Sequence, residues 1–217
     1  MTDARRTLSW LLLALVAVVT AGGAFLGVYY SPSQPVTSLK LAAKSTGAAT
    51  SYTEDLKRVS TANGVAQLHL VLQAPDRAIG FERATGRQLY FVVINNTVYQ
   101  TVPTKITNSV TVHHFNVQQA SNPLAQLDPL PSYLDLVNRA KAIHQNGDVY
   151  SFSLATNTGT KAQLHYTVTG DYVSKIVVDI AGSDTTINVT KINSSPPIVA
   201  PTKSLISSGT TTPTTTP

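Results

Sequence analysis

The fold is decided by residues 161–192, which read KAQLHYTVTGDYVSKIVVDIAGSDTTINVTKI. Apolar and polar side chains alternate over three runs, Lys161–Val168, Tyr172–Ile180 and Thr185–Ile192, and this period is typical of strands with one buried face. The runs are separated by 170–171 (Gly-Asp) and 182–184 (Gly-Ser-Asp), which are residues of tight turns. We therefore expect three consecutive antiparallel strands joined as hairpins.

The same pattern continues toward the N-terminus. Further strands are predicted at Val149–Ala155, Ala66–Leu72, Gln88–Ile94, Val98–Val102 and Ser109–Val117, with Ile79 and Phe81 on another. The run Gln88–Ile94 is apolar at both odd and even positions, which predicts a strand buried on both faces. A sheet of about eight or nine antiparallel strands must curl or close, because flat sheets of that width are uncommon.

Two segments have the composition of helices. Leu39–Ala49 is rich in leucine, alanine and lysine, which favour helices. Ser132 with Asp135 three residues later resembles a capping box, and the helix that it starts is expected to run through His144 and to stop at Asn146-Gly147. We predict an α+β fold in which a strongly curved antiparallel sheet, an unclosed half-barrel, has these helices on its concave face.

The N-terminal segment is long enough to cross a membrane. Trp10–Tyr30 carries no charge and follows Arg5 and Arg6. A helix of about 20 apolar residues spans the hydrocarbon core, and basic residues at one end stay on the cytoplasmic side. We expect an uncleaved signal anchor, with the remainder of the chain extracytoplasmic at the cell membrane. A cleaved signal peptide is the alternative, because small residues suitable for cleavage occur near Gly23.

The sequence is therefore expected to divide into four regions. Residues 1–30 form the cytoplasmic tip and transmembrane anchor, and residues 31–38, with two prolines, form a short stalk. Residues 39–203 form a single ectodomain. Residues 204–217 contain mainly serine, threonine and proline, a composition that predicts a disordered tail.

The composition argues against several classes of function. The chain has no cysteine, so neither a disulfide nor a cysteine-linked lipid is possible. Its net charge of +5 is spread along the sequence, without the basic and aromatic clusters of a nucleic-acid binder. We find no nucleophile elbow or phosphate-binding loop, and we expect no enzyme activity, no cofactor and no metal site.

His113 and His114 are adjacent, so in a strand they point to opposite faces. Four carboxylates, Glu54, Asp55, Asp128 and Asp135, are interpreted as solvated.

The order of these elements resembles the lipoprotein-carrier (LolA-like) fold and, within it, the LppX/LprG-like lipoproteins of actinobacterial envelopes. The resemblance covers Leu39 to Pro201. It is carried by an alanine-rich helix leading into Ser51-Tyr52, by the segments 88–102 and 147–152, and by 187–193 leading into the proline-rich 196–201. The chain departs from these lipoproteins in having no lipobox cysteine, so its membrane attachment depends on the predicted anchor.

The resemblance implies a binding module for the acyl portion of a lipid or lipidated envelope molecule. The ligand would lie between the concave face and the helices, on alternating strand residues: Leu68, Leu70, Phe91, Val93, Phe152, Leu164 and Tyr166. Lys161, Lys175 and Arg83 are candidates to meet the head group at the rim. The alternative is a non-enzymatic structural domain with a filled core that contacts another envelope protein.

Overall fold

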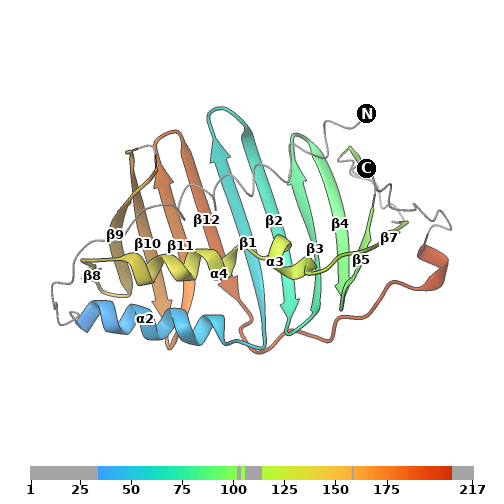
Figure 1. Ribbon diagram of the computed structural model, residues 1–217, viewed down its shortest axis with the longest axis horizontal. Helices are drawn as coiled ribbons and strands as arrows, with labels where there is room; N and C mark the ends of the chain where they lie inside the picture. The colour runs from blue at the N-terminus through green and yellow to red at the C-terminus, as the bar shows by residue number, and fades with distance from the viewer. Residues whose placement is uncertain (1–33, 102–103, 106–113, 158, 207–217) are drawn as a thin grey trace.

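The computed structural model describes residues 34–101, 104–105, 114–157 and 159–206. Within these residues twelve strands form a single antiparallel sheet (Figure 1). The predicted membrane-spanning segment lies outside the described residues, as does most of the predicted tail. Among the described helices, none has both the length and the apolar character needed to span a bilayer.

The sheet consists of two meanders that meet at β1 and β12. The N-terminal strands are β1 (Ser51–Ser60), β2 (Gly64–Gln73), β3 (Arg77–Ala84), β4 (Arg87–Ile94), β5 (Thr97–Gln100), β6 (Thr104–Lys105) and β7 (Asn116–Gln119). The C-terminal strands are β8 (His144–Asn146), β9 (Val149–Ala155), β10 (Lys161–Thr169), β11 (Tyr172–Ile180) and β12 (Ser183–Thr190). Their order is β7-β5-β4-β3-β2-β1-β12-β11-β10-β9-β8, and β6 pairs with β4. The sheet is therefore open, with β7 and β8 at its edges.

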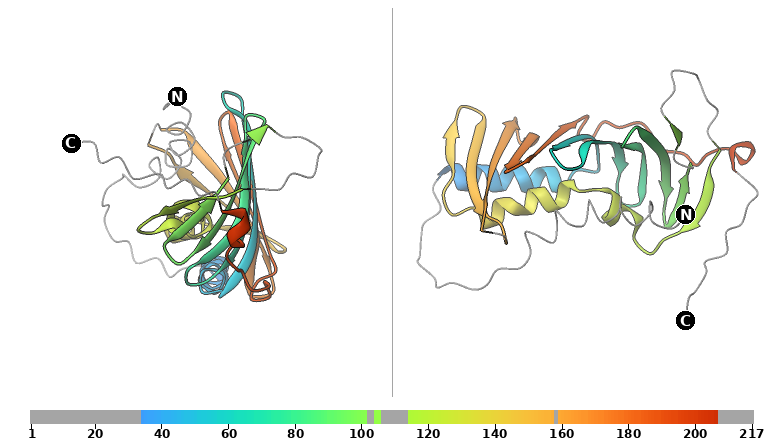
Figure 2. Two further views of the ribbon diagram at one scale, coloured as in Figure 1. Left: turned by 90° about the vertical axis from the view of Figure 1, so that its right-hand side faces the viewer. Right: turned by 90° about the horizontal axis from the view of Figure 1, so that it is seen from above.

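The helices lie on one face of the sheet, here called the concave face (Figure 2). They are α2 (Gln34–Gly47), α3 (Pro123–Leu127) and α4 (Leu130–Asp135), which continues as the 3-10 helix η1 (Leu136–Arg139); a second 3-10 helix, η2 (Lys203–Leu205), lies near the end of the described chain. α2 and α4 run side by side over the C-terminal meander, and α3 lies over the N-terminal one (Figure 1). This arrangement confirms the predicted α+β sheet with helices on one face.

The helix boundaries differ from the predictions for local reasons. α2 begins at Gln34, inside the predicted stalk, because Pro35 falls in the first turn, where its missing N–H removes no bond. α4 begins at Leu130 rather than after Ser132. The N-cap is Pro129, and just before it the Asp128 side chain accepts the Leu130 N–H at 3.1 Å.

The central helix is also shorter than predicted. It becomes a 3-10 helix at Leu136, and Ala140 is already extended. His144, which was predicted to be helical, instead pairs with Ser151 as part of β8. Sheet pairing at the edge outweighs the helix propensity of this segment. The predicted strand Ser109–Val117 overlaps β7 at Asn116 and Val117, and residues 109–113 lie outside the described residues.

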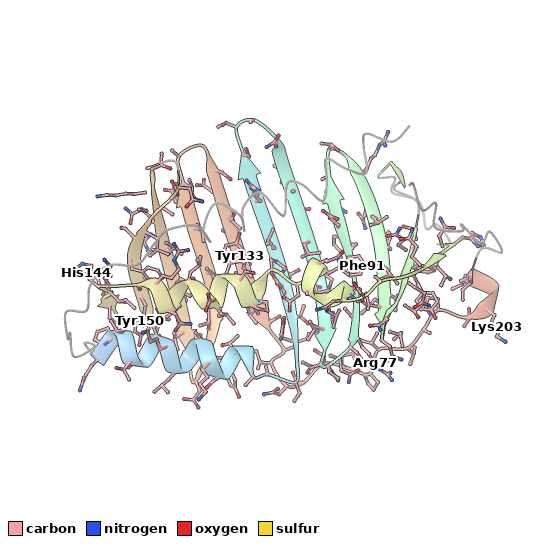
Figure 3. All side chains as sticks on the ribbon, viewed as in Figure 1. Arg77, Phe91, Tyr133, His144, Tyr150 and Lys203 are labelled. Carbon is pink, nitrogen blue, oxygen red and sulfur yellow. The ribbon has the colours of Figure 1, made fainter. Side chains whose placement is uncertain are left out.

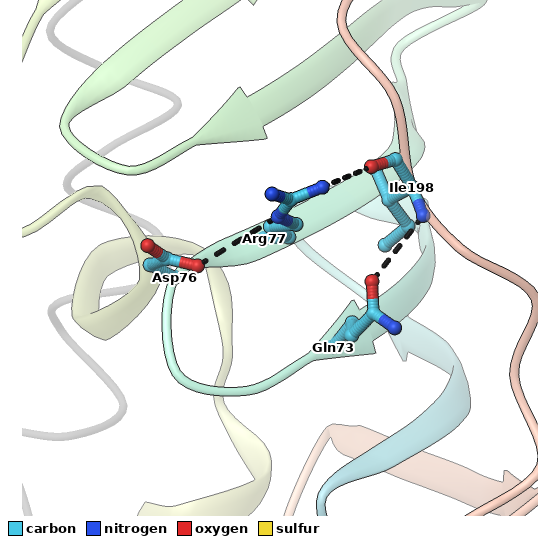
Figure 4. Close-up of polar contacts among 4 residues, drawn as sticks. All are labelled: Gln73, Asp76, Arg77 and Ile198. Carbon is cyan, nitrogen blue, oxygen red and sulfur yellow. Dashed lines mark hydrogen bonds and ion pairs between the residues drawn. The ribbon is translucent and has the colours of Figure 1, made fainter.

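The C-terminal segment binds across the ends of β2 and β3. Arg77 donates from Nη1 to the Ile198 carbonyl at 2.9 Å, and the Ile198 N–H donates to Gln73 Oε1 at 3.3 Å (Figure 4). Arg77 Nε also lies 4.0 Å from Asp76 Oδ1. Ile198 is itself buried. This segment therefore covers strand ends that would otherwise be open to water.

Candidate functional site

The seven residues predicted to line a ligand site all lie on the concave face, beneath the helix layer, and each is at most 6% exposed. They form two groups in different halves of the sheet. Leu68, Leu70, Phe91 and Val93 lie on β2 and β4, and Phe152, Leu164 and Tyr166 lie on β9 and β10. Figure 3 shows this separation in the distance between Phe91 and the helix that carries Tyr133. All seven nevertheless belong to one buried hydrophobic core, because core residues of β1, β11 and β12 lie between the two groups.

The C-terminal group supports α4. The rings of Phe152 and Tyr166 stack with their centroids 5.4 Å apart. The Tyr166 hydroxyl donates a buried hydrogen bond of 2.6 Å to the Tyr133 carbonyl. Burial raises the pKa of Tyr166 above its ordinary value, so this hydroxyl stays a donor. The group thus fixes the distance between the sheet and the helix.

The N-terminal group depends on a glycine. Gly80 pairs with Phe91 on β4 and with Leu70 on β2. A Cβ at position 80 would lie 1.9 Å from the His69 carbonyl oxygen and 3.1 Å from Phe91 Cζ. Only glycine lets the Phe91 ring and the neighbouring strand approach this closely.

A groove of about 620 Å³ lies on the helix layer, between α2 and α4–η1. Its lining residues are Thr37, Lys40, Leu41, Ala43, Lys44 and Gly47 from one helix and Pro131, Leu134, Asp135 and Asn138 from the other. Ala43 and Leu134 are buried, so they form the floor, while Lys44 is exposed. The floor is apolar and the charged groups lie at the rim.

The local sequence explains the groove. Its α2 residues recur every three or four positions, which places them on one side of the helix. Gly47 leaves space at the end of this stripe, since an added Cβ would meet only Leu134 Cδ1, at 3.8 Å. On the opposite wall Asn138 donates to Asp135 Oδ1 at 2.9 Å, which holds the rim carboxylate in place.

The predicted head-group residues are not at this rim. Lys161 and Lys175 are exposed and alternate with buried neighbours on β10 and β11, which places them on the convex face. Arg83 is also on that face, 5.7 Å from the centre of the Phe81 ring. The prediction of these three residues was wrong, because strand alternation points them away from the helices. Lys40 and Lys44 of α2 are the cations that line the groove.

Two neighbouring carboxyl groups, one buried and one partly buried, lie between the sheet and the α3–α4 junction. Glu54 is fully buried, and no described group donates a hydrogen bond to either of its carboxyl oxygens. Asp128 is next to it and accepts a hydrogen bond from the Tyr52 hydroxyl. Burial, and secondarily the charge of Asp128, raise the pKa of Glu54 well above its ordinary value. Burial also raises the pKa of Asp128, although the Tyr52 hydrogen bond opposes this.

The interpretation of Glu54 and Asp128 as solvated carboxylates was therefore wrong. Because two neighbouring carboxyls out of water do not both ionise readily, the raised pKa of Glu54 favours its protonated form. The neighbouring Tyr133 has its pKa raised to about 12 by burial, and Arg58 lowers it in part. Glu54 shares one face of β1 with the buried Tyr52 and Leu56, and this spacing of two residues is the sequence signal for its burial.

The described residues contain no group of three or more metal-ligating side chains. His113 lies outside them, and His114 is exposed. His69 contacts Asp55 across 2.6 Å on the convex face, where both side chains are accessible to water. The histidines that are described are therefore placed singly.

Comparison with solved structures supports the fold. The crystal structure of LprF from Mycobacterium bovis matches with a TM-score of 0.52 and 11% identity, covering 79% of this chain and 99% of LprF. Lipoprotein LppX from Mycobacterium tuberculosis matches with a TM-score of 0.41 and 11% identity, over 77% of this chain and 100% of LppX. A LolA superfamily protein from Nitrosomonas europaea gives 0.31 and 8%, over 73% and 92%. No protein-family model and no curated protein matches the sequence. The match to LprF confirms the predicted fold.

Proposed function

We propose that this protein, which has the LolA-type fold of the LppX/LprG-like lipoproteins, binds the acyl portion of a lipid or lipidated envelope molecule. The ligand lies in the groove between α2 and α4–η1, and its head group meets Lys40 and Lys44 at the rim. The domain is held at the outer surface of the cell membrane by the segment Trp10–Tyr30. No catalytic step is part of this function.

The groove is the observation that carries the proposal. Its volume of about 620 Å³ falls in the range of roughly 300–1,000 Å³ that small-molecule sites occupy. An apolar floor of Ala43 and Leu134, with the exposed Pro131 beside it, suits hydrocarbon. Each Å² of apolar surface removed from water contributes roughly 25 cal/mol before the costs of association.

The seven buried residues of the concave face extend this site only if the helix layer moves. Each helix has a polar attachment to the sheet. Thr46 of α2 accepts the Val173 N–H at 2.8 Å, and Tyr166 donates to α4. A long acyl chain that separates α2 from α4 would then reach Leu164 and Tyr166 beneath them.

The burial of those same seven residues favours a second candidate function. A concave face at most 6% exposed is also what a filled core provides. In that case the domain is a structural or protein-binding module, and the groove holds no ligand.

A photoreactive fatty acid separates the two functions. The full chain is reconstituted in phosphatidylcholine vesicles containing palmitic acid with a diazirine group, irradiated and digested, and the labelled peptides are identified by mass spectrometry. We expect labelling of α2 and α4, and its loss in Gly47→Trp, which fills the groove.

Two matched variants control for indirect effects. Gly47→Ala adds a methyl group with only an ordinary contact and should keep the label. Val65→Trp places the same large ring on an exposed residue of β2, outside the groove, and should also keep it. Labelling confined to the N-terminal segment, with none on α2 or α4, would favour the filled core.

A further inference from the structure

The outer side of α2 combines an exposed apolar residue with two cations. Leu41 is 61% exposed, although most large apolar residues described are covered. It lies between Lys40 and Lys44, and α2 contains no acidic residue. The opposite side of the helix faces the sheet through Val36, Leu39, Ala42, Ala43 and Thr46. α2 is therefore amphipathic, with an outer side that is both apolar and basic.

We propose that the outer side of α2 docks on the membrane surface, with Leu41 inserted at the boundary of head groups and acyl chains and Lys40 and Lys44 on anionic head groups. Helices that lie in this interface have a basic polar side and an apolar residue or stripe directed into the lipid. The long stems of lysine let the ammonium groups reach the head groups while Leu41 is inserted.

The position of α2 in the chain supports a bilayer as the partner. Trp10–Tyr30, the predicted anchor, ends just before α2, and only residues 31–33 separate them. A fully extended linker of this length spans at most about 10 Å. The four steps from Tyr30 to Gln34 therefore keep the start of α2 within about 14 Å of the end of the anchor. This step rests on the membrane anchoring in the proposed function.

Charge complementarity favours lipids with anionic head groups. Lys40 and Lys44 attract phosphate-bearing or other anionic head groups, and salt weakens this attraction. Asp135, the carboxylate on the opposite wall of the groove, is engaged by Asn138. Because the groove is lined by Leu41, Lys40 and Lys44, docking would place its mouth at the bilayer. An acyl chain could then pass from membrane to groove without crossing water.

The absence of cysteine from the chain permits a direct test. Leu41→Cys in the full chain is labelled with the environment-sensitive fluorophore NBD and reconstituted in vesicles of phosphatidylcholine with phosphatidylglycerol. Lipids carrying a nitroxide near the head group quench NBD that enters the bilayer. Val65→Cys is the control, because it is 48% exposed and follows the β1–β2 hairpin, at the end of the sheet away from α2 (Figure 1).

We expect a blue-shifted emission and strong quenching at position 41, and neither at position 65. Lys40→Glu with Lys44→Glu should remove both effects, and so should vesicles of phosphatidylcholine alone in high salt. Equal quenching at positions 41 and 65, or a chain that does not float with the vesicles, overturns the proposal. Acyl labelling of the groove is measured separately. Docking can therefore fail while ligand binding stands, and ligand binding can fail while docking stands.

Discussion

The Tyr166 hydroxyl donates a buried hydrogen bond to the Tyr133 carbonyl, 2.6 Å away, and so connects the middle of β10 to α4. The sequence predicted Tyr166 as a ligand contact. In the structure its polar atom is committed to the helix layer, and its ring lies against Phe152.

Tyr166→Phe should lower the free energy of unfolding by about 0.5–1.5 kcal/mol, because one buried hydrogen bond is lost while the Tyr133 carbonyl still accepts the Leu136 N–H. The ring and its stacking on Phe152 are kept. Urea unfolding followed by circular dichroism measures the change. An unchanged midpoint would mean that the hydrogen bond does not hold α4 to the sheet.

Thr46→Val should weaken the attachment of α2. Thr46 Oγ1 accepts the Val173 N–H at 2.8 Å beside a shift in register between β10 and β11, and it donates to the Ala42 carbonyl. Valine keeps the shape but leaves a buried N–H unpaired, at a cost of about 1–3 kcal/mol. Thr46→Ser retains the hydroxyl and should lose less stability. Hydrogen exchange of the Val173 amide should rise in the valine variant alone.

Gly80→Ala should destabilise the fold by about 2 kcal/mol or more, because a methyl group would overlap the His69 carbonyl and press on Phe91. Gly47→Ala is the control. Its methyl group meets Leu134 at 3.8 Å, and helix propensity makes it neutral to stabilising. Thermal unfolding of the two variants compares them. Similar losses in both would show that β3 does not pack as described.

Glu54→Gln should stabilise the protein near neutral pH. The pKa of Glu54 is higher in the folded chain than in the unfolded one, where it is about 4.5. The folded state then binds more protons, so stability falls as pH rises from 4.5 to the raised folded value. Glutamine removes this dependence. Its advantage over the natural chain should grow with pH across that window and be small at pH 4.

Glu82→Gln is a useful comparison for the pH series. Burial alone raises the pKa of Glu82, without a neighbouring carboxyl. Glu82→Gln should also stabilise the protein increasingly as pH rises, but by a smaller amount than Glu54→Gln. If Glu54→Gln and the natural chain have parallel stability curves from pH 4 to pH 8, the raised pKa of Glu54 in the folded chain is disproved.

Local patterns predicted much of this sheet. The alternation within 161–192 and the turns at 170–171 and 182–184, where Gly170 and Gly182 have positive φ values of 59° and 82°, each depend on neighbouring residues. The β1–β12 pairing does not depend on neighbouring residues, since Glu54 and Val189 are far apart in the sequence and are brought together only by the complete fold. Strand alternation also identified all seven concave-face residues.

The groove could not be predicted in the same way. The recurring positions of Thr37, Lys40, Lys44 and Gly47 mark one side of α2, but nothing in them names α4 as the opposite wall. The extent of α4 was itself set by the pairing of His144 with Ser151 in the sheet. The head-group residues were misplaced although the same alternation, with Leu164 and Tyr166 buried, already points Lys161 to the opposite face.

The claim that the groove holds an acyl ligand is tested most directly by the lipid content of the protein made in its natural host. The full chain and Gly47→Trp are isolated in parallel, extracted with organic solvent and analysed by mass spectrometry. The account predicts one amphiphile recovered in near-equal molar amount with the natural chain and strongly depleted in Gly47→Trp. Recovery of no amphiphile from folded protein, or equal recovery from both chains, would contradict it.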